Sequence, residues 1–350
     1  MGAIPDARGN QPLAQRDLVV IGASAGGVDA LQQVVANLPP EFPAAVLVVL
    51  HVSASGTSVL PQILARSGAL PAAFARDGDE LLRGQIYVAP ADHHMLVHGG
   101  RIRLTKGPRE NGHRPAIDPL FRSAARHRDG RCIGVILSGL LDDGASGLAF
   151  IKAHGGSVVV QDPEDTHFPG MPRAAMALTA VDRVVKASEL ARALCELMEK
   201  PVEAGRKTSE SSLSADRAVD GADRIELVDP SDAAALLGGP PSRLTCPECG
   251  GALWEQENGN ELRFACHVGH AYSIASLTEE QGRALETTLW SAVRALEERA
   301  DMHRRLARRT SSSRGVIYEE RAREAEEHAL GLREMLGRAG RIAAPVPERM

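Results

Sequence analysis

The sequence predicts an α/β protein with a doubly wound, mostly parallel sheet, followed by a small Cys/His segment and a helical tail. Three observations support this fold class. Short β-branched runs alternate with helical patterns from residue 17 to about residue 197, the runs are almost continuously apolar, and the C-terminal third changes in composition. Such alternation is typical of βαβ units, and continuous apolar runs are typical of strands buried on both faces.

The expected strands are short apolar runs that begin at residues 18, 44, 85, 132 and 156, namely LVVIGAS, AAVLVVLHV, QIYVAP, CIGVILSG and GSVVVQD. Between the first two, VDALQQVVANL has helical spacing of its apolar residues. Residues 92–107 favour an antiparallel hairpin that turns at Gly99 and Gly100. These elements predict a first domain over residues 14–200, whose length is typical of a catalytic domain.

The rest of the chain divides by composition into three segments. Residues 201–243 are polar and Ser-rich, which is typical of a linker. Residues 244–275 hold a cluster of cysteines and histidines, and residues 276–340 form a charged helical tail. Apolar residues recur at helical spacing in this tail until SSSRG at 311–315 interrupts them. We therefore expect an αα-hairpin whose second helix ends near Leu336.

Composition excludes several classes of partner. The chain has 350 residues, a formal net charge of -5 and only 3% aromatic residues, so nucleic acid is not expected as a partner. No apolar run reaches the roughly 18 residues of a membrane span, so we expect no direct membrane insertion. The first residues lack a secretory pattern, and the five cysteines are an odd number, which favours the cytoplasm. The oligomeric state is left open.

Ser24 stands between the first strand and the first helix, in the stretch GASAGG at residues 22–27. A serine in this position is commonly a helix N-cap. The spacing Gly22-x-Ser24-x-Gly26 also fits a nucleophile elbow, in which small neighbours let the chain turn sharply and expose the hydroxyl. A phosphate-binding loop is a weaker interpretation, because the glycines follow neither the dinucleotide-binding nor the Walker A pattern.

A nucleophilic serine needs a base and a group that orients the base. His51 ends the second apolar run, and the carboxyl ends of parallel strands line the same crevice. Asp142 and Asp143 follow another buried run, and one of them could be only a turn residue beside Gly144. The order Ser, His, Asp differs from that of α/β-hydrolases, so the elbow does not imply that fold.

Six linked motifs resemble the catalytic domain of the chemotaxis-type protein-glutamate methylesterases (CheB): IGASAGG, LHVS, GQIYVAPADHHM, HRPAIDPLFRSAA, GVILSGLLDDGASG and FPGMPRAA. The resemblance implies a Rossmann-like methylesterase fold and a Ser-His-Asp hydrolase that needs no cofactor for catalysis. It implies methyl-accepting chemoreceptors or related signalling proteins as partners, with deamidation of glutamine as a further activity. By motif, the nucleophile is Ser24, the base His51 and the orienting acid Asp143.

This sequence departs from the family pattern in three places. Asp142 stands where the family usually carries Asn, and Leu140-Leu141 stand where Met-Gly is common. Only about 16 residues precede the first expected strand, so we expect no receiver domain before it and no phosphorylation in cis. The motif match further suggests that His113, Arg114 and the loop 168–173 shape the binding of a receptor helix.

The Cys/His segment has the spacing of a structural zinc site. Cys246 and Cys249 form a C-x2-C pair, Cys266 follows, and His267 or His270 could supply the fourth ligand. His270 is preferred, because C-x3-H leaves the chain room to turn around the ion. The alternative is a metal-free ribbon packed on Trp254, Leu262 and Phe264. Two further cysteines, Cys132 and Cys195, lie in predicted elements and are expected to be buried thiols without chemistry.

These patterns leave three hypotheses for function. The first is the methylesterase, in which Ser24 attacks the side-chain ester. The second is a signalling scaffold that binds a partner through its C-terminal module and uses the esterase fold as a docking surface. The third is a hydrolase that uses the same three residues on another ester.

Overall fold

The computed structural model describes residues 16–52, 58–128, 130–200, 202, 239–258, 261–310 and 313–342. Contacts divide the chain into two compact units, one up to Leu277 and one from Thr278. Most of the predicted linker, residues 201 and 203–238, lies outside the described residues.

A seven-stranded sheet with the order β3-β4-β2-β1-β7-β8-β9 forms the centre of the first unit. All neighbouring strands run parallel. The strands are β1 (Leu18–Ala23), β2 (Ala45–Leu50), β3 (Ala72–Phe74), β4 (Ile86–Val88), β7 (Cys132–Ile136), β8 (Ser157–Gln161) and β9 (Arg183–Val185). The predicted parallel sheet is therefore confirmed, with β1 at its centre.

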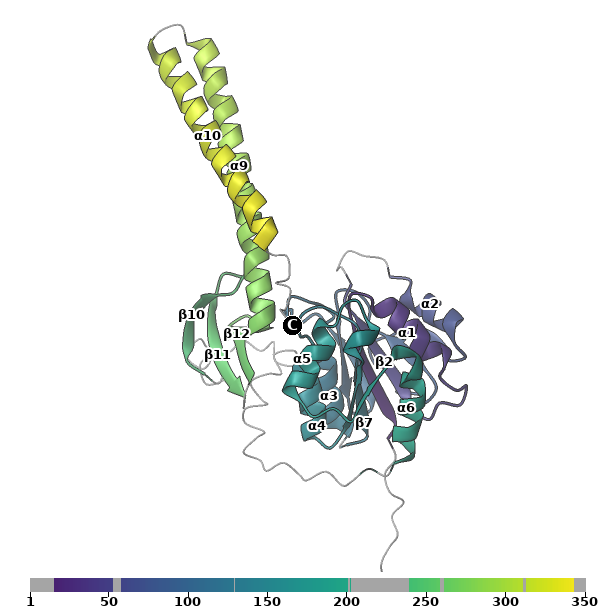
Figure 1. The fold of residues 1–350 in the computed structure, drawn as a ribbon. Helices are drawn as coiled ribbons and strands as arrows, with labels where there is room; N and C mark the ends of the chain where they lie inside the picture. Colours follow the sequence, from purple (N-terminus) through teal and green to yellow (C-terminus); the bar gives the residue numbers. More distant parts are fainter. Residues whose placement is uncertain are drawn as a thin grey trace, which may run out of the picture. The chain divides into compact units, whose positions relative to one another are not determined.

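Helices cover both faces of this sheet (Figure 1). One face packs on α1 (Gly27–Ala36), α2 (Leu60–Ser67) and α6 (Ala187–Glu199), and the other on α3 (Ile117–Arg128), α4 (Ala145–Ala153) and α5 (Gly170–Leu178). Val19 and Ile21 of β1 enter the first core, whereas Leu18 and Val20 enter the second. This burial on both faces explains why the strand sequences are almost continuously apolar.

Two smaller elements complete this layer structure. The hairpin of β5 (His94–His98) and β6 (Arg101–Thr105) turns at Gly99 and Gly100, as predicted, and contributes apolar residues to the second core. A short 3₁₀ turn, η1, spans Pro163–Asp165. β3 and β9 were not among the expected strands, because each has three residues, lies at a sheet edge and is only partly buried.

A separate antiparallel sheet contains the cysteine and histidine cluster, and we call residues 241–273 the Cys/His sheet. Its strands are β10 (Pro241–Thr245), β11 (Ala252–Asn258), β12 (Glu261–Cys266) and β13 (Ala271–Ser273), in that order. Its apolar core is small and consists of Cys246, Leu253, Phe264, Cys266, Tyr272 and the neighbouring Leu277. A core of this size supplies little stability by itself.

The predicted helical tail consists of α9 (Ile274–Arg309) and α10 (Ser313–Ile342). Within the second unit, small buried residues on both helices include Ala300, Ala322 and Ala325. Arg304 pairs with Glu326 across the two helices. The second helix continues to Ile342, beyond the predicted end near Leu336. Among the described residues, none of the helices is both long and apolar enough to cross a membrane.

Candidate active site and Cys/His cluster

Ser24 lies in a sharp turn between β1 and α1. Its backbone N–H donates to the carbonyl of Ser138 at 2.9 Å, which fixes the turn against the end of β7. Gly26 has φ +71°, a left-handed conformation that favours glycine. A Cβ atom on Gly22 would lie 2.4 Å from Cγ2 of Ile117, so α3 approaches β1 closely at this point. The small residues of GASAGG are therefore required by backbone conformation and packing.

The structure brings Ser24, His51 and Asp143 together at the carboxyl ends of three adjacent strands. Nδ1 of His51 lies 3.2 Å from the Ser24 hydroxyl, and Nε2 lies 2.7 Å from Oδ2 of Asp143. When Nε2 carries the proton, it donates to Asp143 and Nδ1 accepts the Ser24 hydroxyl. The sequence placed His51 at the end of a strand, whereas β2 ends at Leu50 and His51 is the next residue.

Asp143 is buried, and its carboxylate is surrounded by donors. Oδ2 accepts the backbone N–H of Ile117 at 2.7 Å in addition to His51, and Oδ1 accepts Nδ2 of Asn111 at 2.9 Å. Burial alone would raise the pKa of Asp143, but the hydrogen bond and charge of His51 outweigh it and hold the pKa well below its usual range. Asp143 is therefore ionised at neutral pH. Asp142 instead accepts the hydroxyl of Ser273 at 2.8 Å.

His113 and Leu141 lie next to this group of residues. The His113 ring stacks on His51, with ring centroids 3.7 Å apart and an interplanar angle of 12°. This contact places His113 against the predicted base. Leu141 has φ +59°, a conformation that favours glycine. In the family that the sequence resembles, glycine is common at this position. This chain therefore adopts the left-handed turn with a leucine, which is less suited to it.

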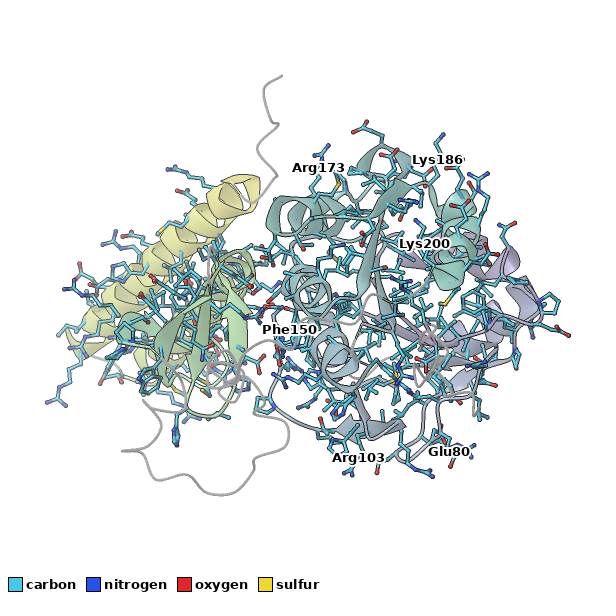
Figure 2. All side chains as sticks on the ribbon, turned by 90° about the horizontal axis from the view of Figure 1, so that it is seen from below. Glu80, Arg103, Phe150, Arg173, Lys186 and Lys200 are labelled. Atoms are coloured by element: carbon cyan, nitrogen blue, oxygen red, sulfur yellow. The ribbon has the colours of Figure 1, made fainter. Side chains whose placement is uncertain are left out.

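The other residues suggested for substrate binding differ in their surroundings. The Arg114 guanidinium donates to Oδ1 of Asp92 and to the carbonyl of Gly107. It therefore already holds neighbouring loops together. Arg173 lies at the outer side of α5 (Figure 2), with its side chain 53% exposed and 3.7 Å from Glu164. The predicted loop 168–173 is only partly a loop, because α5 begins at Gly170; before it Phe168 is exposed, and within it Met171 is buried against the sheet.

Two buried polar residues next to Asp143, Asn111 and Asp118, were not among the predicted site residues. Asn111 donates to both Asp143 and Asp118, and Asp118 accepts the backbone N–H of Gly147 at 2.7 Å. Burial raises the pKa of Asp118 to about 6, and the charge of Asp143 acts in the same direction. The dipeptide Asn111-Gly112 signals only a turn in the sequence, so its side-chain role could not be recognised there.

Three cysteines and one histidine of the Cys/His sheet form a compact cluster. Ligand atoms of Cys246, Cys249, Cys266 and His270 all lie within 4.8 Å of one another. The distances from Nδ1 of His270 are 3.6 Å to Sγ of Cys246 and 3.5 Å to Sγ of Cys266. Tetrahedral zinc bonds of about 2.3 Å to sulfur and 2.0 Å to nitrogen give ligand separations of roughly 3.5–3.8 Å. The cluster could therefore hold a metal ion.

The partner of the other imidazole nitrogen agrees with metal binding. Nε2 of His270 lies 3.2 Å from a carboxylate oxygen of Glu248, which orients Nδ1 toward the cysteines. His267 is exposed and is not part of the cluster. Cys132 is buried and Cys195 partly buried, and burial raises the thiol pKa of both, as expected for cysteines without chemistry.

Comparison with known proteins matches the first unit to one family. A family model described as CheB methylesterase matches residues 19–194. The protein-glutamate methylesterase/protein-glutamine glutaminase 2 of Anaeromyxobacter dehalogenans is 45% identical over 184 residues, covering 53% of this chain and 54% of that protein. The corresponding enzyme of Symbiobacterium thermophilum is 41% identical over 180 residues, covering 51% of this chain and 50% of that protein.

A solved structure also matches about half of the chain. The catalytic domain of the Thermotoga maritima CheB methylesterase superposes with a TM-score of 0.50 and 34% identity, over 53% of this chain and 100% of that one. The chain spans about half the length of the two curated relatives named above. The matched segment contains Ser24, His51 and Asp143 together with the sheet that positions them. The chain belongs to the CheB methylesterase family.

Proposed function

We propose that this protein is a protein-glutamate methylesterase that removes methyl groups from glutamate methyl esters of chemoreceptors or related signalling proteins. The observation that carries the proposal is the hydrogen-bonded series Ser24, His51 and Asp143 at the strand ends. It lies in the segment shared with relatives named for this activity. The proposed reaction takes place in the cytoplasm, where reducing conditions keep cysteines as thiols.

In the first half of the reaction, Oγ of Ser24 attacks the ester carbonyl carbon while Nδ1 of His51 takes the hydroxyl proton. Asp143, ionised and hydrogen-bonded to Nε2, stabilises the imidazolium that forms. The proton then passes to the leaving methoxide, the C–O bond breaks and methanol departs. A water molecule, deprotonated by His51, attacks the resulting acyl-enzyme and releases the glutamate carboxylate and the free serine.

The beginning of α1 supplies electrostatic stabilisation of the transition state in this mechanism. The helix begins at Gly27, three residues after Ser24, and no side chain caps it, although the Gly27 N–H itself donates to the Ser24 carbonyl at 2.9 Å. The remaining N–H groups of the first turn point out of the same end of the helix. These groups and the positive end of the helix dipole favour the negative charge that develops on the carbonyl oxygen. The same steps applied to a glutamine side chain release ammonia, which accounts for glutaminase as a second activity in this proposal.

We further propose that the Cys/His cluster binds structural zinc through Cys246, Cys249, Cys266 and His270. Three thiolates and one imidazole are a donor set that zinc prefers, and their spacing fits tetrahedral coordination. Bound zinc would stabilise the small core of the Cys/His sheet. The catalytic steps above involve only side chains and water, so the proposal includes no catalytic cofactor.

The test is methanol release by the purified full chain from membranes that contain a methylated chemoreceptor. The wild-type protein should release methanol. Ser24→Ala should lower the rate by several orders of magnitude, because Ser24, His51 and Asp143 act together and the loss of one abolishes the contribution of all three. Hydrolysis of small esters without release from methylated receptors would instead indicate another ester as substrate. Unchanged receptor binding with no hydrolysis of any ester would support the scaffold, which the catalytic geometry does not favour.

A further inference from the structure

Asn111 links Asp143 to the Cys/His sheet. Its Nδ2 donates to Oδ1 of Asp143 at 2.9 Å and to Oδ2 of Asp118 at 3.1 Å. Its Oδ1 accepts the backbone N–H of Ser273 and the hydroxyl of Ser276, each at 3.0 Å. The side chain is therefore saturated, with two carboxylates on one side and two donors from the C-terminal part of the unit on the other.

These partners determine which way the Asn111 amide points. A carboxylate can only accept, so Nδ2 must face Asp143 and Asp118, and the donors of Ser273 and Ser276 require Oδ1 on the opposite side. Without the second pair of donors, the amide could rotate and place its oxygen against the carboxylate of Asp143. The two serine contacts thus maintain a hydrogen bond to the residue that orients His51.

The backbone of Asn111 is held by the same sheet. Its N–H donates to the carbonyl of Ala271 at 2.8 Å, and Asn111 has φ +51°, a left-handed conformation. Ala271 directly follows His270 in the chain, at the beginning of β13. A continuous path of short contacts therefore runs from the Cys/His cluster through β13 to Asn111, and from there to Asp143.

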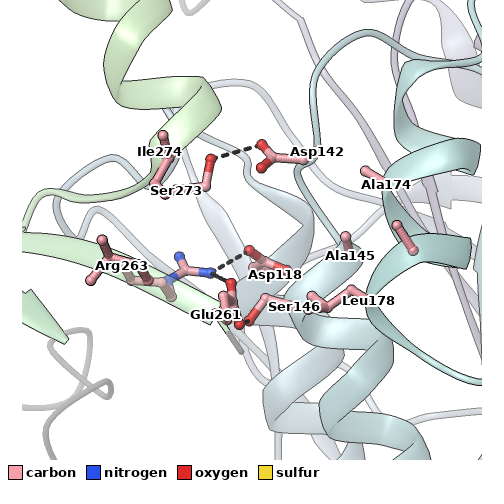
Figure 3. A pocket seen from close by; sticks show the side chains of 12 residues that line it. Asp118, Asp142, Ala145, Ser146, Ala174, Leu178, Glu261, Arg263, Ser273 and Ile274 are labelled. Carbon is pink, nitrogen blue, oxygen red and sulfur yellow. Dashed lines mark hydrogen bonds and ion pairs between the residues drawn. The ribbon is translucent and has the colours of Figure 1, made fainter. Parts of the chain in front are cut away.

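Ion pairs and hydrogen bonds hold the Cys/His sheet against α3 and α4 (Figure 3). Nη1 of Arg263 lies 3.0 Å from Oδ2 of Asp118, and the hydroxyl of Ser146 donates to Glu261 at 2.8 Å. These residues, with Asp142 and Ser273, line a pocket of about 300 Å³. Arg263 and Asp118 are both buried, so their pairing ties the Cys/His sheet to the residues around Asp143.

We infer that the Cys/His sheet and the first turn of α9 together position the proposed catalytic acid, and that Asn111 and Ser276 are positioning residues for Asp143. The inference rests on the proposed function for the role of Asp143. Loss of the Asn111 contact removes one donor to an ionised carboxylate, which lets Asp143 and His51 shift from the geometry that activates Ser24. Loss of a hydrogen bond to a charged group lowers a rate by roughly 10-fold to 100-fold, and a displacement of about 1 Å in a catalytic group has an effect of similar size.

A double-mutant cycle with a reactive-serine probe tests this inference. A fluorophosphonate labels an activated serine: the Oγ–P bond forms, the P–F bond breaks, fluoride leaves, and the base accepts the hydroxyl proton. Asn111→Ala should lower the labelling rate of Ser24 by roughly 10-fold to 100-fold and Ser276→Ala by about 10-fold. The double variant should react no more slowly than Asn111→Ala, because both act through one contact.

Two further variants separate positioning from general loosening of the sheet. Ser276→Thr retains the hydroxyl and should restore labelling. Ser242→Ala removes a hydroxyl that accepts the N–H of Leu244 within β10, and it should label at the wild-type rate. With a methyl-ester peptide as substrate, the positioning variants should lower kcat and leave KM unchanged. Thermal unfolding of each variant shows that it is folded at the assay temperature.

The outcomes distinguish this inference from the proposed function. Wild-type labelling by Asn111→Ala, or additive losses in the double variant, would overturn the positioning role. Fast labelling of Ser24 in the wild type without methanol release would contradict the methylesterase function, and the labelling cycle would still decide the role of Asn111. A fall in labelling that Ser276→Thr fails to restore, in a folded protein, would also contradict the inference.

Discussion

Arg263 is a buried cation among carboxylates, and its replacement by methionine should destabilise the protein in a pH-dependent way. The side chain is 7% exposed and lies 3.0 Å from Asp118, 3.3 Å from Glu261 and 3.5 Å from Glu110. Removing one member of a buried ionic group leaves the remaining charge unpaired, which costs about 3–5 kcal/mol of unfolding free energy. Arg263→Met keeps most of the side-chain length, so the change in charge dominates.

The pH dependence follows from Asp118. Burial raises its pKa in the folded protein to about 6, from an ordinary value of 3.8, and Arg263 acts in the opposite direction. Since the folded state holds this proton more tightly than the unfolded state, the Asp118 contribution to stability falls as pH rises from about 4 through 6. A shift of this size corresponds to about 3 kcal/mol. Without Arg263 the pKa of Asp118 rises further. The stability of the Arg263→Met variant therefore continues to fall as pH rises above 6.

Urea-induced unfolding, followed by circular dichroism at pH 5 and pH 8, measures the effect. At pH 5, where Asp118 is mostly protonated, Arg263→Met should cost about 1–3 kcal/mol, from the lost hydrogen bonds to Asp118, Glu261 and Glu110. At pH 8 the loss should reach about 3–5 kcal/mol. The matched control is Arg103→Met (Figure 2), whose side chain is 56% exposed beside Asp77 and should cost about 0–1 kcal/mol at both pH values. Equal losses at the two pH values would refute this account of Asp118.

Three further predictions concern the acid, the metal and the turn. Asp143→Asn should reduce methyl-ester turnover by roughly 10³-fold to 10⁴-fold, and Asp142→Asn by far less; the opposite ranking would move the acid by one residue. The full chain should retain about one zinc ion through gel filtration, measured by a colorimetric chelator, and Cys249→Ser should lose it; zinc retention by that variant would exclude the proposed ligand. Gly22→Ala should cost about 1–3 kcal/mol in thermal unfolding, because the added Cβ meets Ile117 at 2.4 Å, and a neutral effect would show that α3 relaxes freely.

Much of this protein could be predicted from local patterns. The strands of the parallel sheet are buried on both faces, so their sequences are apolar throughout and easily recognised. Ser24 and His51 follow directly after such strands, and parallel strands end at one edge of the sheet. The spacing of Cys246, Cys249, Cys266 and His270 likewise predicted the cluster that the structure brings together.

The choice between neighbouring residues needed more than a pattern. From residue spacing alone, Asp142 and Asp143 are equally suited to orient His51. Only the resemblance to a family favoured Asp143. In the structure the two side chains diverge, since Asp143 contacts His51 whereas Asp142 contacts Ser273. Both residues lie in the turn between β7, which ends at Ile136, and α4, which begins at Ala145, so no strand or helix period fixes which side chain faces His51.

The sequence by itself determined the fold class, the sharp turn that carries Ser24 and the grouping of the cysteines with His270, because each depends on patterns within short stretches of the chain. Only the tertiary structure decided what surrounds Asp143. Asn111 meets Ser273 across 162 positions of sequence, and Arg263 meets Asp118 across 145. Such contacts carry no local periodicity, since they form only when the Cys/His sheet packs against the helices beside Asp143. Burial then makes each unpaired polar group costly, which is why these distant residues are matched in charge and hydrogen bonding.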